Sequence, residues 1–399
     1  MRPPLAATTL RSFQAGQKTL QFMNLTPSQN LSKAMPKISV IVPCRNEASH
    51  IAACVEGLLA MQAPAGGFEV VVADGISTDG TKQILEQMAN RYPQLKVIDN
   101  PGRTTPCGLN AAIRIARGEI IVRADAHTTY APDYLMECLE TLQQKGADNV
   151  GGPARTKAEG YRQRAVAAAY HSPFSVGGAR FHNIEFDGYV DTVTYGCWPR
   201  SAFEKFGLFD EELVRNQDDE HNLRIIRGGG KVYQSSKIKS WYVPRGSFAA
   251  LFKQYMQYGY WKVRVIQKHK LPASWRHLVP GAFVLALGVS SLLSVFCFLL
   301  SEFSDLFSAP CHLSFDLLIG LVALYGFAVS MASIVTATKT EWKLLPALPV
   351  AFSCYHFGYG CGFLRGIGDF VLLRRRASTV FAELTRTSFK TETTGRADR

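Results

Sequence analysis

Short apolar runs and amphipathic stretches alternate along the first third of the chain. Runs typical of buried strands occupy residues 38–43, 68–73, 95–98 and 119–124. Between them, helical patterns cover residues 48–60, 81–92 and 107–116. This alternation predicts an α/β fold with a mostly parallel sheet and helices on both faces. Ligands of such sheets bind at the carboxyl ends of the strands, so polar clusters directly after strands are the candidates for chemistry.

The last third of the chain is apolar, because charged residues become sparse after about residue 277. Residues 278–300 and 313–336 are each long and apolar enough to cross a bilayer, although Asp316 lies near the start of the second. Residues 347–373 are rich in glycine and aromatic residues and also carry charges. We expect this third segment to be interfacial, re-entrant or a third span.

Basic residues flank the two predicted spans on one side only. Lysines and arginines precede the first span and follow the second, whereas the loop between the spans holds Glu302 and Asp305 without any lysine or arginine. The positive-inside rule therefore predicts a multi-pass membrane protein whose N-terminal domain is cytoplasmic. We expect the membrane to be the inner (plasma) membrane of the cell.

These patterns divide the 399 residues into four parts. Residues 1–36 lack a sustained apolar run before the first strand, and we expect a disordered leader there. Residues 37–270 form the predicted α/β domain, 271–376 the membrane domain and 377–399 a cytoplasmic tail.

The charge and composition of the chain indicate which classes of molecule it can bind. A formal net charge of +12 favours an anionic partner: nucleic acid, a phosphate-rich small molecule or an anionic membrane surface. The chain has no arginine-aromatic block typical of a nucleic-acid-binding module, so we expect no nucleic acid. The nine cysteines form no CxxC pair, which indicates neither a zinc site nor a disulfide framework.

Two of the polar clusters follow the first two predicted strands, at residues 43–47 and 74–81. If Glu47 and Asp74 point into the cleft at the sheet edge, their carboxylates can accept hydrogen bonds from the imide and ribose of a uridine nucleotide. The alternative is that both clusters are ordinary turns, because Gly, Asp, Ser and Thr are common turn and capping residues. Asp79 has the position of a cap for the next helix.

The third cluster contains Asp125 and His127 at the end of the strand that begins at residue 119. Residues i and i+2 of an extended segment share a face, so both side chains can reach one ion. Two protein ligands leave the other positions to diphosphate oxygens and water, which suits Mg or Mn bound together with a nucleotide. The alternative is a strand-end turn with a solvated histidine.

Together these segments resemble the catalytic domain of family 2 glycosyltransferases of the GT-A fold. Four segments occur in the family's order and spacing: residues 38–47, 70–81, 108–110 and 125–127. The resemblance implies a uridine-type donor site at Glu47, Asp74 and Asn110. It also implies a divalent metal at Asp125, which binds the donor as well, with His127 in the place of the second aspartate of the DxD motif.

The resemblance continues over residues 195–200, 206–211 and 216–224, which match the acceptor half of the family domain and include Trp198. Asp218 matches the aspartate of the family's ED motif, so the resemblance implies that it is the general base. Asp219 is a possible second acid, or part of a solvated helix face. We expect Arg224, six positions after Asp218, to anchor it through a buried charged pair.

Residues 254–261 resemble the family's QxxRW motif in a weaker form, with Gln254, Gln257 and Tyr258 in matching places and no arginine. The dense aromatic residues suit either stacking on a sugar at the acceptor site or packing at a membrane surface.

Over residues 37 to about 373 the chain resembles family members of bacterial exopolysaccharide assembly. This resemblance implies an inverting enzyme that transfers a sugar from a nucleotide-sugar donor, a UDP-sugar, to a lipid-linked or polysaccharide acceptor at the membrane. One alternative is a polyprenyl-phosphate sugar synthase, in which a lipid phosphate is the acceptor. An alternative of another class is a non-catalytic membrane protein that binds nucleotides or transports a solute.

Overall fold

The computed structural model describes residues 36–272, 274–301 and 308–382. Its strands are β1 (Ile38–Cys44), β2 (Phe68–Asp74), β3 (Leu95–Asp99), β4 (Ile120–Arg123), β5 (Thr128–Tyr130), β6 (Asn149–Gly152), β7 (Arg155–Thr156), β8 (Gly188–Tyr189), β9 (Thr194–Pro199), β10 (Val232–Gln234) and β11 (Ser240–Tyr242).

The α-helices are α1 (Ile51–Leu59), α2 (Thr81–Arg91), α3 (Thr105–Ile115), α4 (Tyr134–Lys145), α5 (Gly160–Tyr170), α6 (Pro173–Val176), α7 (Arg200–Phe206), α8 (Gln217–Arg227), α9 (Phe248–His269), α10 (Val279–Ser301), α11 (Ser308–Lys339), α12 (Leu348–Gly366) and α13 (Thr379–Ala382). Short 3-10 turns are η1 (Arg180–His182), η2 (Trp275–His277) and η4 (Trp342–Leu344), and a π-helical segment, η5 (Ile367–Leu372), follows α12.

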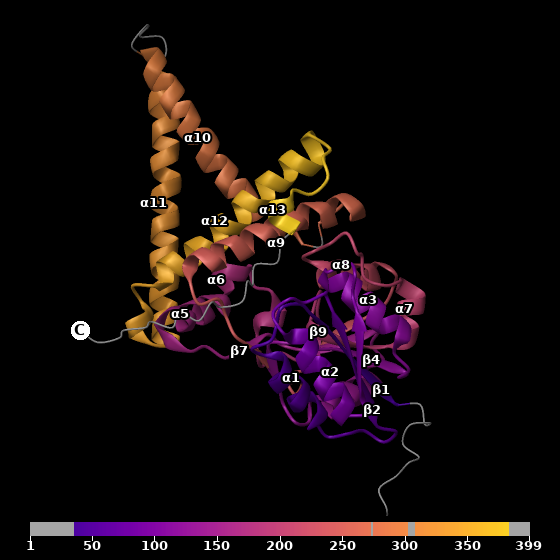
Figure 1. Cartoon of the computed structure of the whole chain (residues 1–399). Coiled ribbons are helices and arrows are strands. Elements are labelled where there is room, and N and C mark those ends of the chain that lie inside the picture. Colours follow the sequence, from indigo (N-terminus) through magenta and orange to yellow (C-terminus); the bar gives the residue numbers. More distant parts are fainter. Residues whose placement is uncertain (1–35, 273, 302–307, 383–399) are drawn as a thin grey trace, which may run out of the picture. The chain divides into compact units, whose positions relative to one another are not determined.

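A large mixed sheet with the order β3-β2-β1-β4-β9-β6-β10-β8 forms the framework of the N-terminal half (Figure 1). Strand β1 lies parallel to both β2 and β4, and β2 lies parallel to β3. Strand β9 runs antiparallel between β4 and β6. The predicted α/β fold is confirmed, and each of the seven predicted strands and helices of the first third is present within a few residues of its expected bounds. A second, smaller sheet has the order β5-β11-β7.

Helices cover both faces of the large sheet because its central strands are apolar on both sides. Val40 and Val42 of β1 belong to a core shared with α1, α2 and α4. Ile41 faces the opposite way, into a core shared with α3, α7 and α8. All three side chains are fully buried, so burial on both faces fixes the register of β1.

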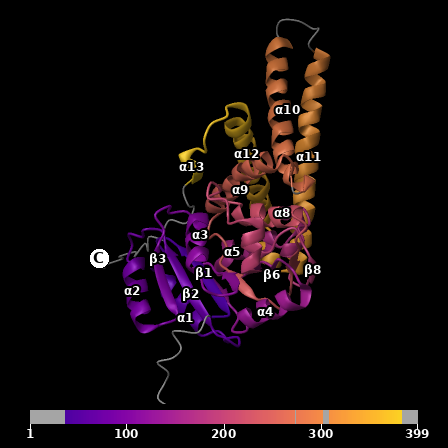
Figure 2. The same cartoon turned by 90° about the vertical axis from the view of Figure 1, so that its right-hand side faces the viewer.

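Helices α10 and α11 form a long pair that lies side by side in Figure 2, whereas Figure 1 shows that the two helices meet at their upper ends and diverge toward α12. Over Trp275–Leu299 and Leu313–Lys339 the chain is long and apolar enough to cross a membrane. Large apolar side chains on the pair are exposed, with Leu292 at 72% and Phe327 at 66%. Such continuous apolar surface on both helices is typical of contact with lipid.

Glycines bring α9 and α12 into close contact. A Cβ atom on Gly259 would lie 2.0 Å from the carbonyl oxygen of Tyr359, and one on Gly362 would lie 1.9 Å from that of Met256. A Cβ on Gly360 would lie 2.5 Å from the carbonyl oxygen of Pro280 in α10. The glycine-rich part of residues 347–373 is therefore a helix packed against α9 and α10, and it is not one of the two candidate spans.

Candidate active site

A cavity of about 580 Å³ lies where the carboxyl ends of β1 and β4 meet the helices of the C-terminal half. Its walls come from both sides of the predicted domain boundary at residue 270. The side chains that carry charge or hydroxyl groups there include Arg45, Glu47, Asp125, His127, Asp218, Asp219, Tyr258, Lys262, Arg276 and Tyr359.

Arg123, the last residue of β4, joins two acidic segments of the cavity wall. Its side chain is 4% exposed. Its Nε and Nη2 atoms donate hydrogen bonds of 3.1 and 3.0 Å to Oδ1 of Asp125. Its Nη1 atom donates to Oδ1 of Asp218, which lies 95 positions later. One buried guanidinium thus binds both carboxylates, that of Asp125 and that of Asp218.

The electrostatic surroundings of Asp218 act in opposite directions. Burial raises the pKa of its carboxyl above the ordinary value, the positive charge of Arg123 lowers it, and the negative charge of Asp125 raises it again. The resulting pKa is raised. A carboxylate with a raised pKa is a stronger proton acceptor than an ordinary aspartate, which suits a general base.

The start of α8 fixes the position of Asp218. Asn216 precedes the helix with a left-handed φ of 62°, a conformation that asparagine tolerates better than most residues. Its side-chain amide donates a 2.9 Å hydrogen bond to the carbonyl oxygen of Tyr258 in α9. The first turn of α8 is therefore tied to α9, and its acidic side chains are favoured by the positive end of the helix dipole.

The chain between Asp125 and Thr128 is a turn and not an extended strand. Strand β4 ends at Arg123, and the backbone N–H of Thr128 donates a 3.2 Å hydrogen bond to the carbonyl oxygen of Asp125. The expectation that Asp125 and His127 share a face because they are two residues apart in a strand is therefore wrong in its premise. Ala126 between them is buried in the core. Both side chains nevertheless line the cavity.

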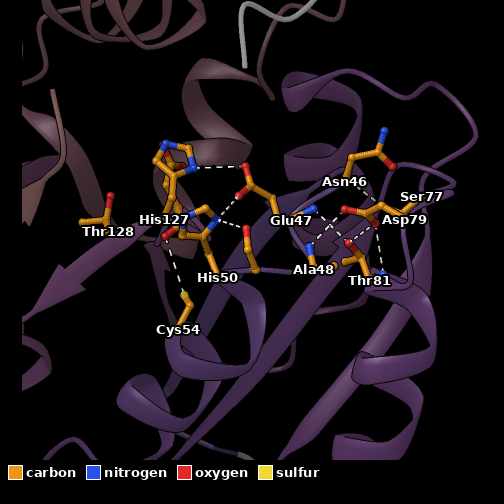
Figure 3. A network of polar contacts seen from close by, with 12 residues as sticks. Asn46, Glu47, Ala48, His50, Cys54, Ser77, Asp79, Thr81, His127 and Thr128 are labelled. Atoms are coloured by element: carbon orange, nitrogen blue, oxygen red, sulfur yellow. Dashed lines mark hydrogen bonds and ion pairs between the residues drawn. The ribbon is translucent and has the colours of Figure 1, made fainter. Parts of the chain in front are cut away.

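Glu47 contacts two imidazole rings, of which only that of His127 lines the cavity (Figure 3). Its Oε1 atom lies 3.2 Å from Nδ1 of His127, and its Oε2 atom lies 3.3 Å from Nδ1 of His50. The loop is held from the start of α2 as well, since the backbone N–H of Glu47 donates a 2.8 Å hydrogen bond to Oγ1 of Thr81. The structure thus brings Glu47 and His127 together.

The donor set fits a divalent cation that is bound together with its substrate and not one caged by protein. Within the described ranges, no group of three or more His, Cys, Asp or Glu side chains is arranged to hold a metal ion. Asp125 and His127 offer one hard oxygen and one imidazole nitrogen on the cavity wall, with Glu47 next to His127. Such an incomplete ligand set leaves positions for diphosphate oxygens and water.

Asp74 does not point into the cleft as expected. It is fully buried at the end of β2 and is not among the residues that line the cavity. Its Oδ2 atom accepts a 3.0 Å hydrogen bond from the backbone N–H of Ser77, and its Oδ1 atom accepts a 2.5 Å bond from the Ser77 hydroxyl. Asp74 therefore closes its own turn, the alternative that its residue type favours. Asp79 accepts from the backbone N–H of Thr81 at the start of α2.

Asn110 also lies away from the cavity, at 2% exposure. Its amide group donates 2.9 Å hydrogen bonds to the carbonyl oxygen of Phe209 and to Oε1 of Glu211. Its oxygen accepts a 3.0 Å hydrogen bond from the backbone N–H of Phe209. The expected donor-binding orientation is not observed, because Asn110 is on the face of α3 that holds the loop before α8.

Arg224 does not pair with Asp218. It donates hydrogen bonds of 3.0 and 2.6 Å to the carboxylate of Glu220, one helical turn earlier. Six positions on a helix put Arg224 on another side from Asp218, whereas four positions bring it next to Glu220. Asp219 forms a 2.6 Å ion pair with Lys262 of α9. Burial opposes ionisation of Asp219, but the charge of Lys262 keeps its pKa below the ordinary value.

The remaining predicted residues divide between the cavity and the core. Trp198 in β9 is 1% exposed and packs in the sheet core, so it does not contact an acceptor in the cavity. Gln254 and Tyr258 line the cavity and are joined by a 3.0 Å hydrogen bond. Gln257 is buried and accepts a hydrogen bond from Arg215.

Sequence reasoning missed Arg123, Lys262 and the side chains that α12 contributes. The signal for Arg123 is a charged residue at the end of an otherwise apolar strand. Tyr195 in β9 has a left-handed φ of 64°. Its ring centroid lies 6.0 Å from the guanidinium carbon of Arg123, and its hydroxyl oxygen lies 2.6 Å from that of Thr128. Nothing in the local sequence indicates these pairings, since each joins distant segments.

The sheet order and the cavity at its strand ends are those of the GT-A fold. Residues 39–208 match the family model for glycosyl transferase family 2, so the chain carries a family 2 glycosyltransferase domain. It is 29% identical over 341 residues to the succinoglycan biosynthesis protein ExoA of Rhizobium meliloti (strain 1021), with 85% of this chain and 96% of the relative covered.

A second relative is the dolichyl N-acetyl-alpha-D-glucosaminyl phosphate 3-beta-D-2,3-diacetamido-2,3-dideoxy-beta-D-glucuronosyltransferase of Methanococcus voltae, 27% identical over 83% of this chain and 97% of its own. Among solved structures, the mannosyltransferase PcManGT of Pyrobaculum calidifontis, in complex with GDP-Man and Mn²⁺, is similar with a TM-score of 0.51 and 19% identity. That similarity covers 83% of this chain and 88% of that one, and it supports the GT-A fold.

Proposed function

We propose that this glycosyltransferase moves a sugar, with inversion, from a UDP-sugar to a lipid-linked saccharide in exopolysaccharide or cell-surface polysaccharide assembly. The observation that carries the proposal is the arrangement of Asp125, Arg123 and Asp218 on one cavity wall. The proposed metal ligand and the proposed base belong to segments far apart in sequence, yet both contact the same arginine.

The donor binds at the strand ends in this proposal. Glu47, His127 and Asp125 line that part of the cavity, with Arg45 and Arg103 supplying positive charge for phosphates. Asp125 and His127 are the proposed ligands of a Mg or Mn ion, which when bound neutralises charge on the departing diphosphate. Glu47 orients His127 through its 3.2 Å contact with Nδ1, so Nε2 of His127 is the nitrogen left to bind a metal.

Asp218 removes the proton from the acceptor hydroxyl as that oxygen attacks the anomeric carbon. The raised pKa of its carboxyl favours proton transfer, and Arg123 keeps the carboxylate in place without occupying both of its oxygens. Attack by an acceptor oxygen from the face opposite the departing UDP inverts the anomeric configuration, and no protein nucleophile is required.

The proposed location is the inner membrane, with the catalytic domain on the cytoplasmic side. The two apolar helices and the basic residues that flank them support this location. The relative from Methanococcus voltae is named for transfer to a sugar carried on a dolichyl phosphate, and ExoA for succinoglycan biosynthesis. The first name supports a saccharide acceptor held on a membrane lipid, and the second supports a role in polysaccharide assembly.

A donor panel tests the proposal. Purified full-length protein in lipid nanodiscs is incubated with individual UDP-sugars, a lipid extract that contains saccharide carriers, and Mn²⁺ or Mg²⁺. UDP release and product mass are followed. We expect transfer from one UDP-sugar, abolished by excess chelator and lowered by about a hundredfold or more in Asp125→Ala. Full turnover in excess chelator contradicts the metal role, and transfer to a bare lipid phosphate supports a polyprenyl-phosphate sugar synthase instead.

A further inference from the structure

The cavity has a second charged cluster on its membrane side, separate from the pair of acids that Arg123 holds. Lys262 of α9 is 5% exposed and donates its hydrogen bond to Asp219. Arg276 of η2 forms an ion pair with Asp191. All four side chains line the cavity. An ammonium has three N–H donors and a guanidinium has five, so each cation has donors beyond its described pairing.

Three neutral polar groups near this cluster lack hydrogen-bond partners within the part of the chain that the structure describes. They are Nδ1 of His182, Nδ1 of His277 and the hydroxyl of Tyr359. All three residues line the cavity, and His182 is 6% exposed. Burial and the nearby charges of His171 and Arg276 lower the pKa of His182 to about 3, so its imidazole is neutral and can donate one hydrogen bond. Buried polar groups of this kind are normally satisfied, which indicates that a ligand supplies their partners.

The cluster lies at the entry to the first candidate span. Trp275, which is 75% exposed, directly precedes Arg276, and tryptophan favours the headgroup level of a bilayer. Helix α10 begins at Val279, and both Val279 and Pro280 line the cavity with Tyr355 and Phe174. An apolar and aromatic wall therefore continues from the cationic groups toward the membrane.

We propose that Lys262, Arg276, His277 and Tyr359 form a subsite for the phosphate or diphosphate of a polyprenyl carrier, with its first isoprene units against Phe174, Tyr355 and Val279. This inference rests on the proposed function, because it assigns the carrier end of the acceptor. The cavity is then lined by two sets of cations, Arg45 and Arg103 for the donor phosphates and Lys262 and Arg276 for the carrier phosphates. The acids Asp125 and Asp218 line the same cavity.

Binding of farnesyl diphosphate to the full-length protein in nanodiscs tests the subsite. UDP and Mn²⁺ are kept at saturation so that the donor end is filled. We expect farnesyl diphosphate to bind, and Lys262→Met to weaken its binding by about tenfold or more. Tyr359→Phe removes only a hydroxyl without a described partner, so it should fold normally and weaken binding by a few fold. Lys268→Met is the matched control, since Lys268 is on the same helix but pairs with Asp210 and Glu212 outside the cavity.

Binding of inorganic diphosphate and of farnesol measures how much the headgroup and the tail each contribute to the affinity. If inorganic diphosphate and farnesol both bind more weakly than farnesyl diphosphate, the result supports a subsite for a lipid-linked diphosphate. If inorganic diphosphate binds as tightly as farnesyl diphosphate, the assignment of a lipid ligand is overturned. Wild-type affinity for farnesyl diphosphate in both Lys262→Met and Tyr359→Phe overturns the subsite. If UDP itself fails to bind, the proposed function fails, and the farnesyl diphosphate titration without UDP still tests the subsite.

Discussion

Arg123 donates a hydrogen bond from Nη1 to Oδ1 of Asp218, and this contact joins the end of β4 to the first turn of α8 across 95 positions of sequence. The same guanidinium binds Asp125. Changes at any one of these three residues therefore affect the charge that the other two experience.

Replacing Asp218 by asparagine removes the proposed proton acceptor and keeps its shape. We expect kcat for saccharide transfer to fall by about a hundredfold to ten-thousandfold, with UDP binding unchanged. Steady-state kinetics and UDP titration measure the two effects. Asp99→Asn is the control, because Asp99 lies on β3 outside the cavity and pairs only with Lys82 among the described contacts. Retention of most activity in Asp218→Asn contradicts the base assignment and favours a phosphate acceptor, which needs no base.

The raised pKa of Asp218 predicts how activity depends on pH. The base works as a carboxylate, so kcat/KM should fall as pH decreases through this pKa, at a higher pH than for an ordinary aspartate. Arg123→Gln removes the positive charge that lowers the pKa, so the acidic limb of the profile should move to still higher pH. A limb that stays in place or moves to lower pH contradicts this coupling. UDP binding by the variant checks that it is folded.

Asn110 gives a test that separates structure from donor binding. Asn110→Ala leaves the backbone N–H and C=O of Phe209 without their described partner, so we expect a loss of about 1–3 kcal/mol in the free energy of unfolding. At a temperature where the variant is folded, KM for the UDP-sugar should stay within about twofold of the wild-type value. A large increase in KM with unchanged stability supports the donor-binding role implied by the family resemblance.

The buried carboxylate of Glu69 should make the free energy of unfolding depend on pH. It is 3% exposed, and burial acts to raise its pKa. Hydrogen bonds from Ser39 and Arg117 nevertheless hold the pKa below the ordinary value. The folded pKa is depressed, so the stabilisation is complete above the unfolded value of about 4.3 and decreases as pH falls toward the folded pKa.

In Glu69→Gln the thermal unfolding temperature should be lower at pH 7, and the difference from wild type should shrink in acid. Glu86→Gln is the control, because Glu86 is exposed on α2. A difference that grows as the pH falls shows the opposite linkage.

Gly362→Ala tests the contact between α9 and α12. The added methyl would lie 1.9 Å from the carbonyl oxygen of Met256, so the helices must separate, and we expect poor folding or a markedly lower unfolding temperature. Gly320→Ala in α11 meets nothing within 4 Å and should be neutral or slightly stabilising. Equal unfolding temperatures for the two variants would show that the helices are not in contact there.

The strands and helices of the first third follow from local pattern, because burial on both faces makes the central residues of β1 and β2 apolar. The family resemblance located Asp218 and Glu47 on the cavity wall without fixing their partners. Local pattern failed at residues 125–128, where a turn replaces the extended segment that was expected to carry both Asp125 and His127. Local pattern also did not give the ion-pair partners of Arg123 and Arg224, because those partners depend on which elements meet in space. Asp74 and Asn110 show that a matching motif does not determine the direction of a side chain.

The glycines of α9 and α12 also affect how natural sequence variation in this protein should be interpreted. Gly259, Gly360 and Gly362 each exclude even a methyl group, yet none of them lines the cavity. In a mutational screen scored by activity, these positions would be as intolerant as Asp218. Screens that do not also measure protein abundance would therefore misassign them to the catalytic machinery, and the glycine-rich stretch would be mistaken for a ligand-binding motif.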